Sequence, residues 1–290
     1  FRELEERMAV LPKDHFFNSG MPHAHSYTSY FATNQDSRTG LLAMLFSRLV
    51  PFEAYSERDA RRYLFLKGER SLVDEMSSSG YRTALAAAQT DEEIVVFELP
   101  SWEDKLVLTE DEFEDHGRYL CFNPYAFEHD CEDEILLPRI FSELDAHERV
   151  FLFQEGVFGH IGDYYDATGK SAAQYYGEHL AAIQEHLAKR KELDRTLIVV
   201  TSDHGIRDWD YRERRWAYRL PLLFINPRFS HEERKGLYNQ SDFAAILATE
   251  MQGAPPPRPR EVSVFVGCTN SSLVGSVTAE GDLLVVKNRK

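Results

Sequence analysis

The sequence predicts an α/β fold: a three-layer sandwich with a mostly parallel central sheet and a small antiparallel subdomain at the C-terminal end. Three observations support this prediction. Continuous apolar runs, typical of strands buried in parallel sheets, occur at 150–153, 197–200 and 222–225. A helical pattern at 171–190 separates the first two runs. After the prolines at 255–257, the composition changes to short β-branched stretches separated by turn residues.

The elements follow in order along the chain. Residues 39–49 have a helical pattern, 71–79 form a short helix that Gly80 stops, and 81–88 form an outer strand. In the helix at 171–190, residues at helical spacing form one stripe, which consists of Tyr175, His179, Ala182, Ile183 and Leu187. A strand, a helix and a second strand imply a right-handed crossover within a parallel sheet.

Three short strands are expected at 262–266, 273–277 and 283–286. A tail of this length is too short to bury a core of its own. We therefore expect a catalytic-type α/β domain at 1–254, without its first strand, and a small β subdomain of the same fold at 255–290.

Composition excludes several classes of function. The 290 residues have a formal charge of −15, which argues against nucleic acid as a partner. No apolar run approaches the ~20 residues that cross a bilayer, so we expect no membrane segment in this chain. Three cysteines without C-x-x-C spacing indicate neither a zinc knuckle nor a disulfide framework, although a Cys121–Cys131 pair stays open. The abrupt start at Phe1 indicates a chain truncated at its N-terminus.

The strongest motif is Thr201-Ser202-Asp203-His204-Gly205, directly after the apolar run at 197–200. In α/β sheets, the carboxyl ends of strands are where ligands bind. A carboxylate and an imidazole suit a divalent cation such as Zn²⁺ or Mn²⁺. Asp203 and His204 are therefore candidate metal ligands.

This S-D-H-G motif resembles the metal-binding signature of the alkaline phosphatase superfamily, particularly its sulfatase-like branch of lipoteichoic acid synthases and phosphoethanolamine transferases. Residues 34–47 are similar to the nucleophile helix of that family, and 71–83 to the helix and strand that follow it. Residues 154–160, 220–222 and 241–253 resemble later segments in the same order. The resemblance spans nearly the whole chain, and it implies the alkaline-phosphatase-like fold.

The resemblance places the nucleophile at the start of the helix near residue 39. Thr39 is favoured, since its oxygen would meet both the metal and the positive end of the helix dipole, and Ser37 is the alternative nucleophile. Arg38 is a candidate for binding the substrate anion. An ungapped match to the sulfatase C-x-P-S-R pattern puts Asn34 at the nucleophile position, where an amide cannot act. Because no cysteine lies near this helix, formylglycine formation from cysteine is excluded.

Two further residues come from the resemblance. His160 lies in a glycine-rich segment after the run at 150–153, where the family has a histidine that contacts substrate. Arg215 lies where relatives place a basic residue against the substrate anion. His23 and His25 are interpreted as surface-loop residues, because no third ligand is near them in the sequence.

The sequence thus predicts a metal-dependent hydrolase or transferase that acts on phosphate esters, with one divalent metal ion (Mn, Zn, Ca or Mg) held by Asp203, His204 and Thr39. Expected substrates are small-molecule or lipid-headgroup esters of phosphate or sulfate. Two alternatives stay open: a sulfatase, and a catalytically degenerate sulfatase-like binding domain. A transferase would work as the extracytoplasmic domain of a membrane-anchored protein; otherwise we expect a cytoplasmic protein.

Overall fold

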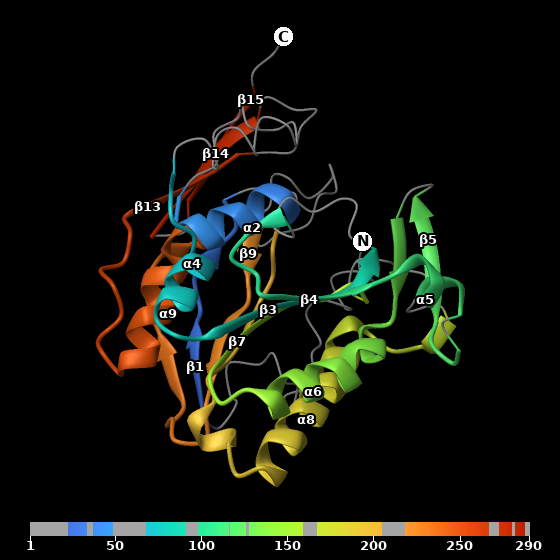
Figure 1. Cartoon of the computed structure of the whole chain (residues 1–290). Coiled ribbons are helices and arrows are strands. Elements are labelled where there is room, and N and C mark those ends of the chain that lie inside the picture. The colour runs from blue at the N-terminus through green and yellow to red at the C-terminus, as the bar shows by residue number, and fades with distance from the viewer. Residues whose placement is uncertain are drawn as a thin grey trace. The chain divides into compact units, whose positions relative to one another are not determined.

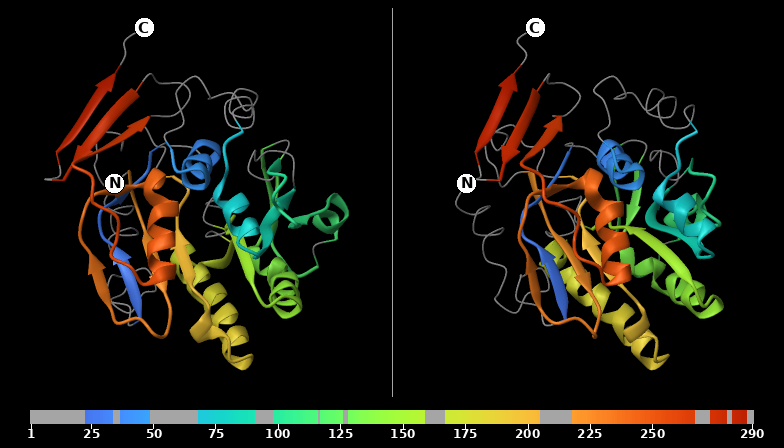
Figure 2. Two further views of the ribbon diagram at one scale, coloured as in Figure 1. Left: turned by 60° about the vertical axis from the view of Figure 1, so that its left-hand side comes forward. Right: turned by 90° about the vertical axis from the view of Figure 1, so that its left-hand side faces the viewer.

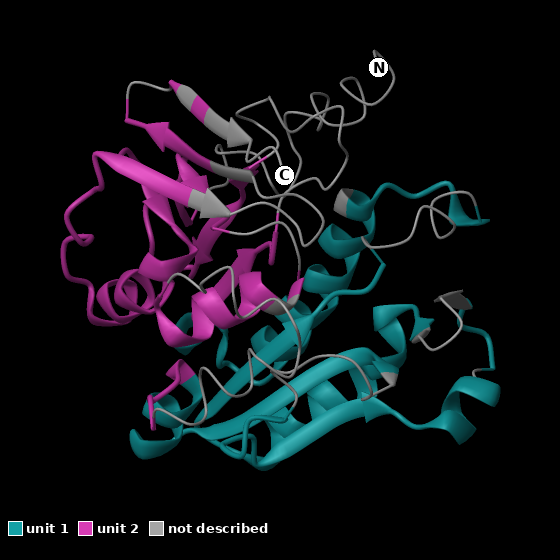
Figure 3. Ribbon diagram, turned by 90° about the horizontal axis from the view of Figure 1, so that it is seen from above, with its two compact units in different colours: residues 1–21, 73–196 teal, residues 22–72, 197–290 magenta. Residues whose placement is uncertain are grey.

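The computed structural model describes residues 23–33, 37–48, 68–90, 98–115, 117–125, 128–158, 167–204, 218–266, 273–279 and 282–287. These residues form helices and strands in a mixed α/β arrangement (Figure 1). The chain divides into two compact units, distinguished by colour in Figure 3. Unit 1 is Phe1–Met21 with Val73–Thr196, and unit 2 is Pro22–Leu72 with Leu197–Lys290.

Unit 1 contains a sheet in which β3 (Arg82–Thr90) is the central strand. It pairs in parallel with β4 (Asp104–Leu108) on one side and with β7 (Val150–Glu155) on the other. Towards its end β3 also pairs antiparallel with β6 (Glu128–Cys131), which forms a hairpin with β5 (Cys121–Tyr125). The outer position expected for 81–88 is therefore wrong. Its alanines are fully buried, and such small side chains allow both neighbours and the covering helices to approach closely.

Helices and apolar side chains cover this sheet. One core cluster joins Ala86 and Ala88 of β3 to Leu136 and Ile140. Alternate residues of β7 point to opposite faces, so Leu152 packs against this cluster whereas Phe151 stacks on Trp102. The helical elements that begin or lie in this part of the chain are α4 (Leu72–Ser78), α5 (Glu110–Glu114), η3 (Asp133–Leu136), α6 (Leu137–Ala146), α8 (Ala172–Lys189) and η4 (Leu193–Arg195).

Helix α8 follows directly from its sequence. Ser171 caps its N-terminus in a capping box with Gln174, and the expected stripe is buried at Tyr175, His179 and Leu187. The short α4 also agrees with the prediction, since the chain turns after it at Gly80 with a φ of 81°.

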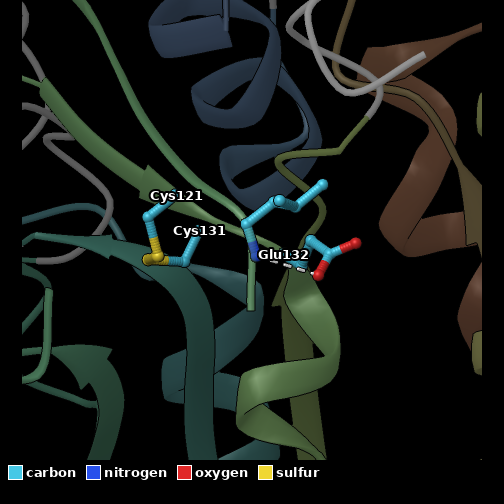
Figure 4. The surroundings of a disulfide bond; sticks show 4 residues. Cys121, Cys131 and Glu132 are labelled. Carbon is cyan, nitrogen blue, oxygen red and sulfur yellow. Dashed lines mark hydrogen bonds between the residues drawn. A yellow bond between two sulfur atoms is a disulfide. The ribbon is translucent and has the colours of Figure 1, made fainter. Parts of the chain in front are cut away.

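A disulfide between Cys121 and Cys131 joins the β5–β6 hairpin (Figure 4). Beside it, the Glu132 carboxylate accepts a hydrogen bond from the Leu120 backbone N–H at 3.0 Å. The pairing that the sequence left open is therefore present. The disulfide closes a short loop and fixes the point where the chain enters η3.

Unit 2 contains a four-stranded sheet of order β11-β1-β10-β8, flanked by helices α2 (Ser37–Phe46) and α9 (Phe243–Gln252) (Figure 2). Its strands are β11 (Glu232–Arg234), β1 (Ala24–Tyr27), β10 (Leu222–Ile225) and β8 (Ile198–Thr201). β10 is buried as expected, but it runs antiparallel to both β1 and β8. A continuous apolar run shows that a strand is covered on both faces and does not specify the direction of its neighbour.

Two smaller sheets complete unit 2. One has the order β12-β2-β9, from β12 (Tyr238–Asn239), β2 (Tyr30–Phe31) and β9 (Arg219–Leu220), and the one-turn η7 (Gln240–Asp242) follows β12. The other is the predicted C-terminal antiparallel sheet of β13 (Val262–Val266), β14 (Leu273–Thr278) and β15 (Leu283–Lys287).

The fold class is thus confirmed: α/β with a parallel sheet and a separate small antiparallel sheet. The expected domain boundary after 254 stays a prediction.

Candidate functional site

Helix α2 presents the candidate nucleophiles in its first turn. After this first turn the helix is apolar on all sides, and residues 41–45 are buried to 2 % exposure or less. Ser37 is half-buried, and Thr39 is 2 % exposed. No acidic residue lies in the first turn, so the positive end of the helix dipole is not neutralised by a side chain of the helix itself.

The loop after β8 presents the candidate metal ligands. Ser202 Oγ donates a hydrogen bond to the His204 carbonyl at 3.0 Å, which fixes the backbone on both sides of Asp203. Asp203 Oδ2 lies 3.6 Å from His204 Nε2, with side-chain exposures of 26 % and 16 %. The two side chains therefore lie together, and both remain accessible to a small ion.

Gly40 brings these two elements into contact. A Cβ at position 40 would lie 1.9 Å from the Asp203 carbonyl oxygen, closer than any side chain can approach. Only glycine allows the first turn of α2 to pack directly on the backbone of Asp203. Thr39, the preceding residue, is thereby placed at the loop that carries Asp203 and His204.

Gln240, in η7, joins the same two elements. Its side chain is fully buried, and its Nε2 donates to the Asp203 carbonyl. Its Oε1 accepts from both the backbone N–H and the hydroxyl of Thr33, at 2.8 and 3.1 Å. One amide thus holds both the chain that leads into α2 and the loop after β8.

The sequence analysis did not identify Gln240. Its sequence signal is weak: Gln240 lies in an Asn239-Gln240-Ser241-Asp242 turn, in which Asn239 and Asp242 form a capping box.

His25 was wrongly assigned to a surface loop. It lies in β1, and its Nδ1 is 2.6 Å from Oε2 of the buried Glu250. The error arose because a strand of four residues is too short for its pattern to be detected from the sequence.

The remaining predicted residues cannot be placed in the site. Three of them lie outside the described residues: His160, Arg215, and Asn34, which the ungapped match to the sulfatase pattern puts at the nucleophile position. Of Arg38, only the backbone within α2 is described. Their roles stay predictions.

One group of three metal-ligand side chains occurs in the described part of the chain, and it is not the predicted one. It consists of Asp104, Glu143 and His147 in unit 1. Arg82 already ion-pairs with Asp104, and its Nε lies 3.5 Å from Glu143 Oε1. Because a guanidinium already pairs with both carboxylates, the group is better explained as an ion-pair network than as a metal site.

The Asp203–His204 pair has the donor chemistry of a divalent-metal site: one carboxylate and one imidazole, both partly exposed. Within the described ranges no third carboxylate, histidine or cysteine joins them in such a group. The residues present therefore fit part of a metal site.

The sequence matches no protein-family model and no curated protein. Solved structures do match. A protein in the alkaline phosphatase superfamily from Vibrio parahaemolyticus superposes with a TM-score of 0.68 at 16 % identity, covering 92 % of this chain and 69 % of that chain.

The chain has the alkaline phosphatase superfamily fold.

Two further solved structures have the same fold. The lipoteichoic acid synthase LtaP from Listeria monocytogenes matches with a TM-score of 0.59 at 13 % identity, covering 90 % of this chain and 78 % of that one. The C-terminal periplasmic domain of EcEptC from Escherichia coli, in complex with Zn, matches with a TM-score of 0.55 at 14 % identity, covering 87 % and 80 %. The matched structures also include a phosphonate monoester hydrolase from Silicibacter pomeroyi and a protein in complex with its substrate D-glucosamine-2-N,6-O-disulfate. Among the described helices, none has the length and apolar character of a membrane span.

Proposed function

We propose that this chain is a metal-dependent hydrolase or transferase of phosphate esters, in which Asp203 and His204 bind a divalent cation and Thr39 is the nucleophile. The observation that supports the proposal most strongly is the direct packing of Gly40 on the Asp203 carbonyl. It joins the first turn of α2 and the loop after β8 within one compact unit.

The proposed chemistry follows from the side chains of this unit. Thr39 Oγ forms a bond to phosphorus as the bond between phosphorus and the leaving alcohol breaks, and water or a second alcohol then releases the phosphoryl group from Thr39. The first turn of α2 favours the anion through the positive end of its dipole. A divalent cation, when bound, supplies Lewis-acid stabilisation of charge on the phosphoryl oxygens.

Ser37 stays the alternative nucleophile, and its greater exposure to solvent supports this role. It is half-buried, whereas Thr39 is 2 % exposed. Thr39 is the residue next to the contact with Asp203, which favours it. Separate Thr39→Ala and Ser37→Ala variants distinguish the two, since only loss of the nucleophile should lower turnover by at least about 100-fold.

Phosphate is favoured over sulfate as the reacting group. Among the matched structures are LtaP, the EcEptC domain and a phosphonate monoester hydrolase from Silicibacter pomeroyi, although sulfatase structures match as well. No cysteine lies in α2 to serve as the precursor of formylglycine.

The test is to offer bis(p-nitrophenyl) phosphate, p-nitrophenyl phosphate and p-nitrophenyl sulfate side by side, each with Mn²⁺, Zn²⁺, Mg²⁺ and Ca²⁺. We expect phosphate-ester turnover that Asp203→Ala abolishes and His147→Ala, in the other group of ligand-type side chains, leaves unchanged. Preference for the sulfate ester would identify a sulfatase instead. Metal binding without turnover of any ester would identify a degenerate binding domain.

A further inference from the structure

Arg260 joins the segment before β13 to the one-turn η7, within unit 2. Its Nε and Nη2 donate to the two carboxylate oxygens of Asp242, each at 2.7 Å, and Nη2 also donates to Ser241 Oγ at 3.0 Å. Its backbone N–H donates to the Leu237 carbonyl at 2.8 Å. Arg260 therefore contacts the chain on both sides of Gln240.

This ion pair has a geometry that single surface pairs lack. Exposed pairs usually contribute little, because two long side chains must be ordered in water. Here the guanidinium is bidentate on one carboxylate, the Asp242 side chain is 17 % exposed, and a third hydrogen bond fixes the orientation of the guanidinium plane. The contact is therefore specific to arginine at position 260.

Other residues of the same segment contact the same part of the chain. Ser263 is fully buried, and its Oγ accepts from Asn239 Nδ2 at 3.2 Å. The Pro257 carbonyl accepts from the Tyr238 hydroxyl at 3.1 Å. Residues 257–263 thus lie along β12 and η7.

The turn η7 has little support of its own. It consists of three residues, and a single 3₁₀ turn is too short to be stable by itself. In its capping box, the Asp242 carboxylate accepts from the Asn239 backbone N–H at 2.9 Å. The same oxygen, Oδ2, accepts from Arg260 Nε. Loss of the guanidinium therefore allows the capping carboxylate to turn towards water.

Gln240 connects the position of η7 to the candidate metal ligands. Its side chain is fully buried, its Nε2 donates to the Asp203 carbonyl and its Oε1 accepts from the Thr33 backbone N–H. Because both ends of the amide are bonded in a packed interior, a shift of η7 must move or break these bonds.

We propose that Arg260 is a positioning residue for the candidate metal ligands: it holds η7, and Gln240 of η7 holds the backbone of Asp203. For its effect on metal binding, the inference rests on the proposed function. Its effect on η7 and Gln240 does not. The competing explanation is that Arg260 contributes to folding alone, and two experiments separate these roles.

The first experiment follows Gln240 in the metal-free protein by hydrogen exchange resolved to single amides. The Thr33 amide reports on Gln240, and the Asn239 amide reports on the cap of η7. In Arg260→Ala we expect exchange at both amides to rise at least about 10-fold, with exchange in β10 unchanged. Arg258→Ala, which removes an exposed arginine of the same segment, is the matched control and should change neither amide. Unchanged exchange at Thr33 would overturn the proposal, because Gln240 would then keep its place without Arg260.

The second experiment measures the affinity for Zn²⁺ and Mn²⁺ by isothermal titration. Arg260→Ala should lower this affinity on the order of 10-fold, as the loss of outer supports does at metal sites. Gln240→Met removes the bond to Asp203, so Arg260→Ala should have little further effect on affinity in that background. Equal losses in both backgrounds would show that Arg260 does not act through Gln240, and the proposal would be wrong. If the wild-type protein binds neither cation, the proposed function fails, whereas exchange at Thr33 still decides whether Arg260 positions Gln240.

Discussion

Substituting Gly40 with alanine tests whether the first turn of α2 and the loop after β8 form one site. The new Cβ would lie 1.9 Å from the Asp203 carbonyl oxygen. Since carbon–oxygen contacts are normally about 3.3 Å or longer, the two backbones must separate by roughly 1.4 Å. Overpacking of this kind costs about 2 kcal/mol, which lowers Tm by roughly 4–8 °C in a domain of this size.

The effect on turnover should be far larger than the effect on stability. Displacing a nucleophile by about 1 Å costs on the order of 100-fold in rate. The assay is kcat/KM for the preferred phosphate ester at saturating metal, with Tm measured on the same samples. Metal affinity should fall as well, because the Asp203 backbone is displaced.

Gly253→Ala is the matched control. Gly253 follows α9 with a φ of 64° and has no atom within 4 Å of its hypothetical Cβ. Alanine there costs roughly 1 kcal/mol of backbone strain without a clash, so stability should fall while turnover is retained. A folded Gly40→Ala variant with wild-type turnover and metal affinity would refute the reasoning, because the contact would then be irrelevant to the site.

Further predictions concern the supports of the site and the response to pH. Gln240→Glu keeps the acceptor for Thr33 but sets an oxygen against the Asp203 carbonyl, so we expect turnover to fall at least about 10-fold with a loss of about 1–3 kcal/mol in denaturant unfolding. Asp133, whose pKa burial raises to about 6, contributes stability below about pH 4 that is lost as pH rises through about 6. His179, whose pKa burial lowers to about 4, contributes stability above about pH 6.5 that is lost as pH falls through about 4. Each shift corresponds to roughly 3 kcal/mol, and the two contributions change in opposite directions as pH falls. Asp133→Asn should therefore make Tm fall more steeply between pH 7 and 4.5 than it does in the wild type, and equal slopes would contradict this. Reduction of the β5–β6 disulfide, which spans ten residues, should lower the free energy of unfolding by about 3 kcal/mol, measured by denaturation with and without reductant; an unchanged midpoint would show that the bond is not formed.

The sequence was sufficient where the pattern is local and long. Helix α8 was predicted from its stripe of residues at helical spacing, and the three C-terminal strands were predicted from β-branched runs between turns. Asp203 and His204 follow a strand, as expected, because position at a strand end is also a local property.

Contacts between distant segments could not be predicted in this way. The antiparallel direction of β10 and the central position of β3 depend on which strands pair, and an apolar run carries no information on its partner. The roles of Gly40, Gln240 and Arg260 depend on contacts across 18 to 207 residues of sequence. A glycine that packs on a carbonyl and a buried amide that joins two segments become visible only once the chain is folded.

The most direct test of the central claim is the binding of divalent metal to the wild type, Asp203→Ala and His147→Ala proteins, measured by isothermal titration with Zn²⁺ and Mn²⁺ and by elemental analysis. We predict that the wild type and His147→Ala bind metal alike, whereas Asp203→Ala loses at least about 100-fold in affinity. If His147→Ala loses the metal and Asp203→Ala retains it, the metal site lies among Asp104, Glu143 and His147, and the assignment of Asp203 and His204 is wrong.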